Sequence, residues 1–151
     1  MSEPGGLPRV AIVRLDPDLA LPSRRYSGDA GYDLHARVDV VLAPGGGRAA
    51  VPTGIALSLP EGWAGLVLPR SGLALHHGVT CLNAPGLIDS GYRDEVRVVL
   101  VNHDPVAAFA AARGDRIAQL VLHRLDPFEW DEVDDLDDSE RSRRGFGSSG
   151  L

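Results

Sequence analysis

Hydrophobic residues occur in short runs along the chain, and glycine, proline or acidic residues interrupt them every few positions. The longer runs are rich in valine, isoleucine and leucine and cover residues 10–15, 38–42, 55–59, 63–68, 96–102 and 117–125. Ile55, Leu57 and Leu59 alternate with Ala56 and Ser58, which indicates a half-buried strand, and the other runs are also expected to be strands. A short helix is expected over 73–77 with Ser71 as its N-cap, and 106–112 fits either a helix or a short strand. This pattern predicts an all-β domain, a jelly-roll-like barrel or sandwich with one short helix.

Composition divides the chain into two parts. Residues 1–130 are expected to form the β jelly-roll domain, because they carry the apolar runs. Residues 131–151 are expected to be an acidic linker and a mobile C-terminal arm, since seven of the ten residues at 131–140 are acidic.

Three further features limit the class of protein. No apolar window approaches the roughly 18 residues of a membrane helix, and residues 1–6 lack the pattern of a secretory signal. Cys81 is the only cysteine, which excludes an internal disulfide and a cysteine-rich metal cluster. A cytoplasmic protein without a membrane partner is expected.

The net charge of −6 argues against a general nucleic-acid binder. All fifteen basic residues are arginine. Each cation available to a phosphate is therefore a planar fork that can bind two oxygens at once.

The segment 83–102 carries the first candidate chemistry. Its first half is rich in turn residues, its second half is a β-branched run, and residues 79–82 offer a partner strand, so a wide hairpin is expected. Asp89 and Tyr92 lie at its mouth. A carboxylate and an aromatic ring on a loop held by a sheet suit a pocket for a small polar ligand; an aspartate that caps a turn is the alternative.

The tail offers a second candidate. Arg141 to Arg144 bring a run of cations, and Phe146 is the one large apolar side chain between flanking glycines. Such an arm fits a lid that orders on a ligand, or an unstructured solubilising tail.

Five separated stretches, taken together, resemble the motifs of the trimeric deoxyuridine triphosphatases (dUTP pyrophosphatases). They are, in order, AGYDLHA at 30–36, PRSGLA at 69–74, NAPGLIDSGYRDEV at 83–96, GDRIAQL at 114–120 and RSRRGFGSSG at 141–150. The resemblance implies a jelly-roll homotrimer whose three active sites are each built from all three subunits. It implies Mg²⁺-assisted hydrolysis of dUTP to dUMP and pyrophosphate, which limits uracil in DNA and supplies dUMP for dTMP synthesis.

The resemblance also implies roles around the phosphates. Asp89 orients and deprotonates the attacking water, and Asp33 holds magnesium, through water in its shell. The triphosphate contacts belong to a cradle of donors, namely Arg70, Ser71, Gly72 and Gln119.

Base and sugar selection are implied for the hairpin. The Asn83 side chain and the main chain around Leu87, Ile88 and Arg97 match the polar edge of uracil. The Tyr92 ring packs against C2′ of the sugar and leaves no room for a ribose hydroxyl.

In the arm, the resemblance implies that Arg141 pairs with the γ-phosphate, Phe146 stacks on uracil and Ser148 binds phosphate. The chain departs from the family here, because Ser142 and Arg144 stand where glycine is usual. Fewer glycines make the backbone less permissive, which leaves the path of the arm open.

Three other functions compete with this one. A dCTP deaminase shares this fold and trimer, but it needs an acid/base carboxylate in the strand against the base, and residues 98–101 supply none. A non-catalytic nucleotide-binding trimer would be marked by the loss of Asp33, Arg70 or Asp89, and all three are present. A nucleic-acid binder that uses the arginines of the tail conflicts with the acidic run beside them.

Overall fold

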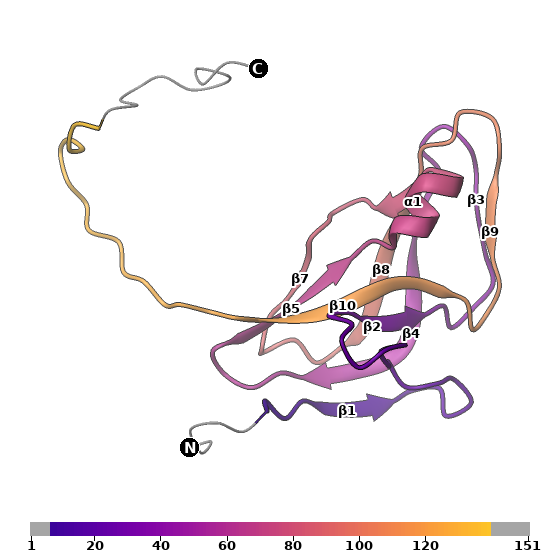
Figure 1. Ribbon diagram of the computed structural model, residues 1–151, viewed down its shortest axis with the longest axis horizontal. Coiled ribbons are helices and arrows are strands. Elements are labelled where there is room, and N and C mark those ends of the chain that lie inside the picture. The colour runs from indigo at the N-terminus through magenta and orange to yellow at the C-terminus, as the bar shows by residue number, and fades with distance from the viewer. Residues whose placement is uncertain (1–6, 140–151) are drawn as a thin grey trace.

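A computed structural model describes residues 7–139 of the chain (Figure 1). Ten strands and one helix follow in the order β1 (Ala11–Arg14), β2 (Tyr32–His35), β3 (Val40–Leu42), β4 (Arg48–Ser58), β5 (Trp63–Leu68), α1 (Ser71–His77), β6 (Val79–Cys81), β7 (Gly86–Ile88), β8 (Glu95–Asn102), β9 (Phe109–Ala111) and β10 (Arg116–Arg124). Strands therefore dominate the regular structure of the described residues, with one short helix, as the apolar pattern predicts.

The strands form two four-stranded sheets and one two-stranded sheet. One sheet has the order β1-β4-β8-β6, the second β2-β10-β5-β7, and β3 pairs with β9. Every pairing between these strands is antiparallel. The predicted jelly-roll-like fold is confirmed, and solved structures that share it are described with the site below.

A single hydrophobic core holds the sheets together. It takes side chains from both four-stranded sheets and from the small one, and its most buried members include Leu34, Leu42, Val51, Val98 and Ile117. In β8 the buried positions run almost without interruption, so both faces of this strand are covered. That explains why its sequence lacks clean alternation.

The ends of the elements test the sequence predictions in detail. The strand expected at 63–68 coincides with β5, and 106–112 contains the strand β9, not a helix. The N-cap prediction for Ser71 is wrong: Arg70 holds that position without a side-chain cap hydrogen bond, and Ser71 is the first helical residue. The helix ends at Gly78, whose φ of 65° is left-handed and whose amide bonds the carbonyls of the last turn.

The expected hairpin exists, but its loop crosses between sheets. β6 pairs with β8 as predicted, with Cys81 opposite Leu100. Within the loop, β7 leaves that sheet and pairs with β5 at the edge of the other one. Asp89 follows β7 directly, so the position of its carboxylate depends on a strand that the sequence analysis did not anticipate.

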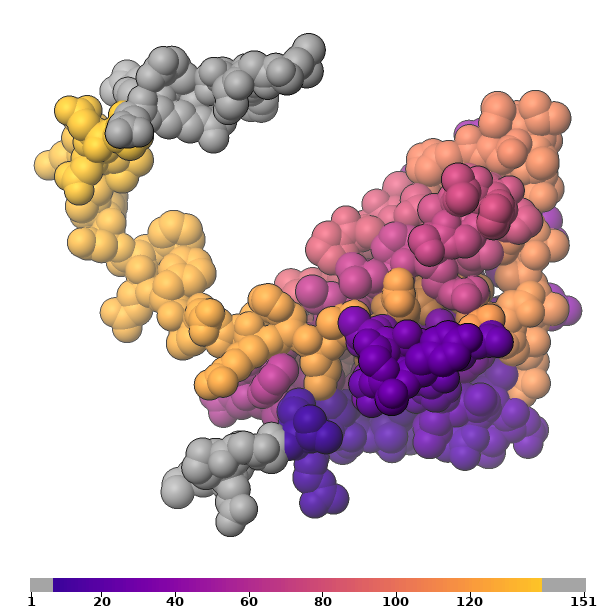
Figure 2. Space-filling model, viewed as in Figure 1, coloured from indigo at the N-terminus to yellow at the C-terminus, as the bar shows by residue number. Residues whose placement is uncertain are grey.

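After β10 the chain leaves the sheets. Residues 125–139 run away from the body as an extended arm (Figures 1 and 2). The arm carries large apolar side chains that face solvent, including Phe128 (72% exposed) and Trp130 (89% exposed), whose rings contact each other edge to face. Within residues 7–139, no helix has the length and apolar character to cross a membrane.

Candidate functional site

A polar cavity of about 340 Å³ gathers most of the residues predicted to hold phosphate and metal. Asp33 comes from β2, Arg116 and Gln119 come from β10, and residues 70–72 form the start of α1. Its lining consists of Arg25, Asp29, Ala30, Gly31, Asp33, Arg70, Ser71, Gly72, Arg116 and Gln119. Gln119 lies opposite Asp33 of β2 on one side and opposite Leu68 of β5 on the other. Strand pairing therefore fixes the positions of these three residues relative to one another.

Charge is distributed unevenly around Asp33. Its carboxylate lies between two guanidinium groups, 3.5 Å from Nε of Arg70 and 3.2 Å from Nη1 of Arg116. Arg70 also donates through Nη1 to the carbonyl of Arg116 at 3.0 Å, which fixes the two arginines relative to each other. One carboxylate between two cations leaves a net positive charge, and this favours an anion such as a phosphate chain.

Gln119 is held against a glycine. Its Nε2 donates to the carbonyl of Pro69 at 3.0 Å. A Cβ atom on Gly31 would lie 2.2 Å from Oε1 of Gln119, a distance that no real side chain occupies. The glycine in the first motif is therefore required by the close approach of the Gln119 amide to the backbone.

His35 lies two positions beyond Asp33 on β2. Burial lowers the pKa of its ring, the Asp33 carboxylate opposes this effect, and the guanidinium groups of Arg116 and Arg70 lower the pKa further, so the net shift is downward. His35 therefore adds no further positive charge beside Asp33 at neutral pH.

The donor set of the cavity fits one kind of metal site. Asp29 and Asp33 supply hard carboxylate oxygens. Residues 7–139 contain no group of three or more histidine, cysteine or acidic side chains arranged to hold a metal. Magnesium takes one or two carboxylates and completes its shell with waters and substrate phosphates, so these residues fit magnesium bound together with a phosphate chain and do not fit zinc.

The remaining predicted residues form a second group, around β7 and the start of β8. Asp89 is exposed at the end of β7, and Leu87 is 64% exposed while its neighbour Ile88 is buried. Tyr92 is fixed at two points: its amide donates to the Asp89 carbonyl at 3.1 Å, and its phenol donates to the Glu95 carbonyl at 2.9 Å.

The other two members of this group flank it. Asn83 is exposed in the loop before β7, and a Cβ atom on Gly86 would lie 3.4 Å from its Nδ2 atom. Arg97 is exposed on β8. The hairpin thus presents a turn, an edge strand and polar side chains in one place.

The two groups are far apart in one chain. β2 and β7 are opposite edges of the same sheet, with β10 and β5 between them. At normal strand spacing and rise, Asp33 and Asp89 are separated by three strand widths and about four residues along the strands, on the order of 20 Å. Asp33, Arg70, Ser71, Gly72 and Gln119 lie together, whereas Asp89 and the hairpin residues do not reach their cavity.

Two basic residues of the cavity, Arg25 and Arg116, were not among the predicted site residues. Arg116 and Gln119 are three apart, and in a regular strand such residues point to opposite faces. A register shift between Arg116 and Ala118 brings both into the same cavity. The sequence pattern does not predict this bulge, so only the structure reveals that Arg116 lies beside Asp33. The predicted arm residues Arg141, Phe146 and Ser148 lie outside the described residues.

Comparison with known proteins gives a consistent result. The model of the dUTPase family matches residues 18–150. A deoxyuridine 5'-triphosphate nucleotidohydrolase of Thermobifida fusca is 56% identical, over 96% of this chain and 80% of that protein. The protein of the same name from Corynebacterium glutamicum is 52% identical, over 95% of this chain and 96% of its own length.

Solved structures agree with the fold. A mutant dUTPase of Staphylococcus bacteriophage 80alpha, with dUpNHpp, superimposes with a TM-score of 0.82 at 28% identity, covering 95% of this chain and 99% of that one. A mutant dUTPase of phage phi11 of S. aureus, whose structure concerns the coordination of a structural Mg(II) ion, gives a TM-score of 0.74 at 25% identity, covering 84% of this chain and 97% of that one.

Proposed function

The chain belongs to the dUTPase family, and from this premise we propose how its residues hydrolyse dUTP to dUMP and pyrophosphate. The activity itself follows from the family and from relatives that are half or more identical over nearly the whole chain. It limits uracil in DNA and supplies dUMP for dTMP synthesis. Because it acts on the pool of free nucleotides, we place it in the cytoplasm.

The cavity around Asp33 receives the triphosphate. A nucleoside triphosphate carries about four negative charges, and its transfer chemistry depends mainly on positioning and charge neutralisation. Arg70 supplies a bidentate fork, and Ser71 and Gly72 supply a hydroxyl and amides at the start of α1. Gln119 adds a neutral donor whose place is fixed by Pro69 and Gly31.

Asp33 is the residue that would hold magnesium, through water in the ion's shell. When bound, the ion neutralises charge on the phosphate oxygens. Arg70 and Arg116, which pair with Asp33 in the free chain, would pair with the phosphates when the substrate is bound.

Asp89 acts on the attacking water. Its exposed carboxylate accepts a proton from a water molecule placed in line with the α-phosphorus, and pyrophosphate leaves on the opposite side. The phosphorus–oxygen bond to the β-phosphate breaks as the new bond to water oxygen forms. Asp89 is fixed for this task by β7 and by the turn that its own carbonyl closes with Tyr92.

The hairpin selects the nucleoside. The Asn83 side chain and the main chain around Leu87, Ile88 and Arg97 pair with the acceptor–donor–acceptor edge of uracil. Cytosine would place a donor against a donor, at a cost of about 1–3 kcal/mol for each buried group left unpaired. The Tyr92 ring excludes a ribose 2′-hydroxyl.

The observation that carries the proposed assembly is the separation of Asp33 from Asp89. A metal-bound phosphate chain and its attacking water must lie within a few ångströms of each other, so the two acids must come from different subunits. We propose a homotrimer whose sites each combine the Asp33 cavity of one subunit with the hairpin of another.

The arm of residues 131–151 completes the site of a neighbour, with Arg141 on the γ-phosphate, Phe146 on uracil and Ser148 on phosphate. Trp130, which directly precedes this arm, is 89% exposed among the described residues. An apolar ring so exposed on a segment that leaves its own domain supports packing against another subunit.

A deaminase of the same fold is not favoured. β8 does carry one carboxylate, because the strand begins at Glu95. That carboxylate is buried and bonds the Gly54 amide and Arg37, so it is not free for proton transfer to a base.

The proposal is tested by following pyrophosphate and nucleotide products from dUTP, dCTP, dTTP and UTP, with magnesium and with a chelator. We expect magnesium-dependent release of pyrophosphate from dUTP and far slower turnover of the other three. Deamination of dCTP, or equal turnover of dUTP and UTP, would contradict the assignment.

A further inference from the structure

β4 carries a wide irregularity opposite the start of β8. Pro52 lies opposite Arg97 and Ala56 lies opposite Glu95, so three residues of β4, 53–55, face the single residue Val96. Such a bulge removes regular ladder hydrogen bonds from backbone groups, and here they are buried. Gly54 in the bulge has a φ of 75°, a conformation that favours glycine.

Side chains replace the missing ladder bonds. The Glu95 carboxylate accepts a hydrogen bond from the Gly54 amide at 2.8 Å, and the Thr53 hydroxyl donates to the Val96 carbonyl at 2.6 Å. Glu95 is only 8% exposed. Its carboxylate is therefore part of the internal structure of the sheet and not a surface charge.

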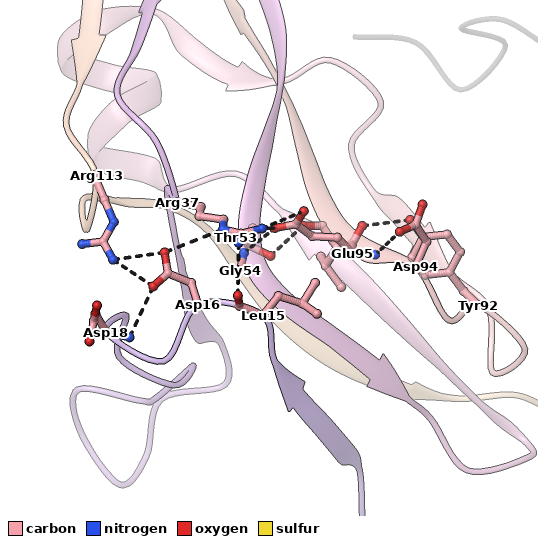
Figure 3. Close-up of polar contacts among 11 residues, drawn as sticks. Leu15, Asp16, Asp18, Arg37, Thr53, Gly54, Tyr92, Asp94, Glu95 and Arg113 are labelled. Carbon is pink, nitrogen blue, oxygen red and sulfur yellow. Dashed lines mark hydrogen bonds and ion pairs between the residues drawn. The ribbon is translucent and has the colours of Figure 1, made fainter.

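A cation also binds this carboxylate (Figure 3). Nη1 of Arg37 lies 3.3 and 3.4 Å from the two carboxylate oxygens of Glu95. Arg37 also donates through Nη2 to the Leu15 carbonyl at 3.1 Å and lies 3.7 Å from the Asp16 carboxylate. β4 therefore bonds the Glu95 carboxylate directly through Gly54, and Arg37 bonds it from the segment after β2. Arg37 is in turn held by Leu15 and Asp16, which follow β1.

The main chain of the same residue holds Tyr92. The phenol of Tyr92 donates to the Glu95 carbonyl at 2.9 Å, while the amide of Tyr92 donates to the Asp89 carbonyl at 3.1 Å. Tyr92 is 39% exposed, so the protein around it covers it only partly. The anchor of the phenol therefore contributes much to the orientation of the ring.

We propose that Glu95 is a positioning residue for sugar discrimination: its carboxylate, seated in the β4 bulge, fixes the carbonyl that orients the Tyr92 ring. The inference rests on the role of Tyr92 in the proposed function. Exclusion of a single hydroxyl is steric, so it depends on the ring staying within a fraction of an ångström of its place. Loss of the seat lets the Glu95 main chain shift, and the ring that is bonded to its carbonyl shifts with it.

The measurement is the ratio of kcat/KM for dUTP to kcat/KM for UTP. In Glu95→Ala the Gly54 amide and Arg37 lose their partner, and we expect this ratio to fall by about tenfold or more. Glu95→Gln keeps the shape and an acceptor for Gly54 but loses the charge, so a smaller fall is expected; it also carries the test if the alanine variant does not fold.

Tyr92→Phe keeps the ring and removes its tether, so it should lower the ratio as well. Because both changes release the same ring, the double variant Glu95→Ala with Tyr92→Phe should lose little more than the larger single effect.

Thr53→Val is the matched control. It removes the other hydrogen bond of the same bulge without touching the Glu95 carboxylate, so it should lower the melting temperature and leave the ratio unchanged. Equal loss of discrimination in Thr53→Val, or an unchanged ratio in both Glu95 variants while Tyr92→Ala lowers it, would overturn the role of Glu95. An unchanged ratio in Tyr92→Ala would instead refute the sugar role of Tyr92 and leave dUTP hydrolysis standing.

Discussion

Asp33 lies on β2 and Asp89 lies directly after β7, and these two strands are the opposite edges of one four-stranded sheet. Two strands separate them, and their registers are offset along the sheet. The two carboxylates proposed to act on one triphosphate are thus held rigidly apart within a chain. The same rigidity makes the assembly of the site testable.

Mixing inactive subunits tests whether a site is shared. Asp33→Asn and Asp89→Asn each remove one half of the proposed site, and each variant alone should be nearly inactive. In mixed trimers, a site is intact when the Asp89→Asn variant supplies its Asp33 and the Asp33→Asn variant supplies its Asp89. Random assembly from equal amounts of both variants gives this combination in about a quarter of the sites. We therefore expect about a quarter of wild-type turnover after the two are co-refolded or co-expressed.

The control for this experiment mixes the Asp89→Asn variant with a double variant that carries both Asp33→Asn and Asp89→Asn. Because every subunit of this mixture lacks Asp89, no arrangement of subunits restores a site. Absence of recovery in the first mixture, with mixed trimers demonstrated by mass spectrometry, would show that both acids act within one chain.

Asp89→Asn alone tests the base. The substitution keeps the size of the side chain and removes its ability to take a proton, so turnover of dUTP should fall by about a hundredfold or more. Asp89 is exposed, and its side chain has no hydrogen bond within the described residues, so the melting temperature should stay within about a degree or two of wild type. A variant that retained full kcat would remove Asp89 from the chemistry.

Gly31→Ala tests the placement of Gln119. The new Cβ would occupy space 2.2 Å from the Gln119 amide oxygen, so the side chain must leave its position beside Pro69. Losing one hydrogen bond to a charged phosphate should reduce kcat/KM by about tenfold to a hundredfold. Gly28→Ala is the control, because a Cβ there meets no atom within 4 Å. If both variants behaved alike, the close approach would have no bearing on activity.

Removal of residues 141–151 tests the arm. Within residues 7–139 the hydrophobic core is formed without this segment, so the truncated chain should fold and assemble. Turnover should fall strongly, because the γ-phosphate and the exposed face of uracil lose their proposed partners. Size-exclusion chromatography and dUTP kinetics measure the two outcomes, with removal of residues 1–6 as the control truncation. Kinetics equal to wild type would reject a closing arm.

Much of the fold can be read from the chain alone. Alternation at 55–59 and the aliphatic run at 96–102 mark β4 and β8, since a strand covered on one face and a strand covered on both faces leave different patterns. The five motifs supply the chemistry, because the residue types suited to phosphate, water and uracil stand at their usual intervals. Gly31 and Gln119, remote in sequence, both belong to those motifs.

What the sequence did not determine arises from contacts between strands. The register shift that turns Arg116 toward Asp33, the crossing of β7 to the second sheet and the bulge that buries Glu95 each depend on pairing with a distant segment. Local patterns record which residues prefer a strand, but they carry no information on how strands align. Alignment, set by core packing and by the hydrogen bonds of neighbouring strands, decides which side chains meet and which, like Asp33 and Asp89, are kept apart.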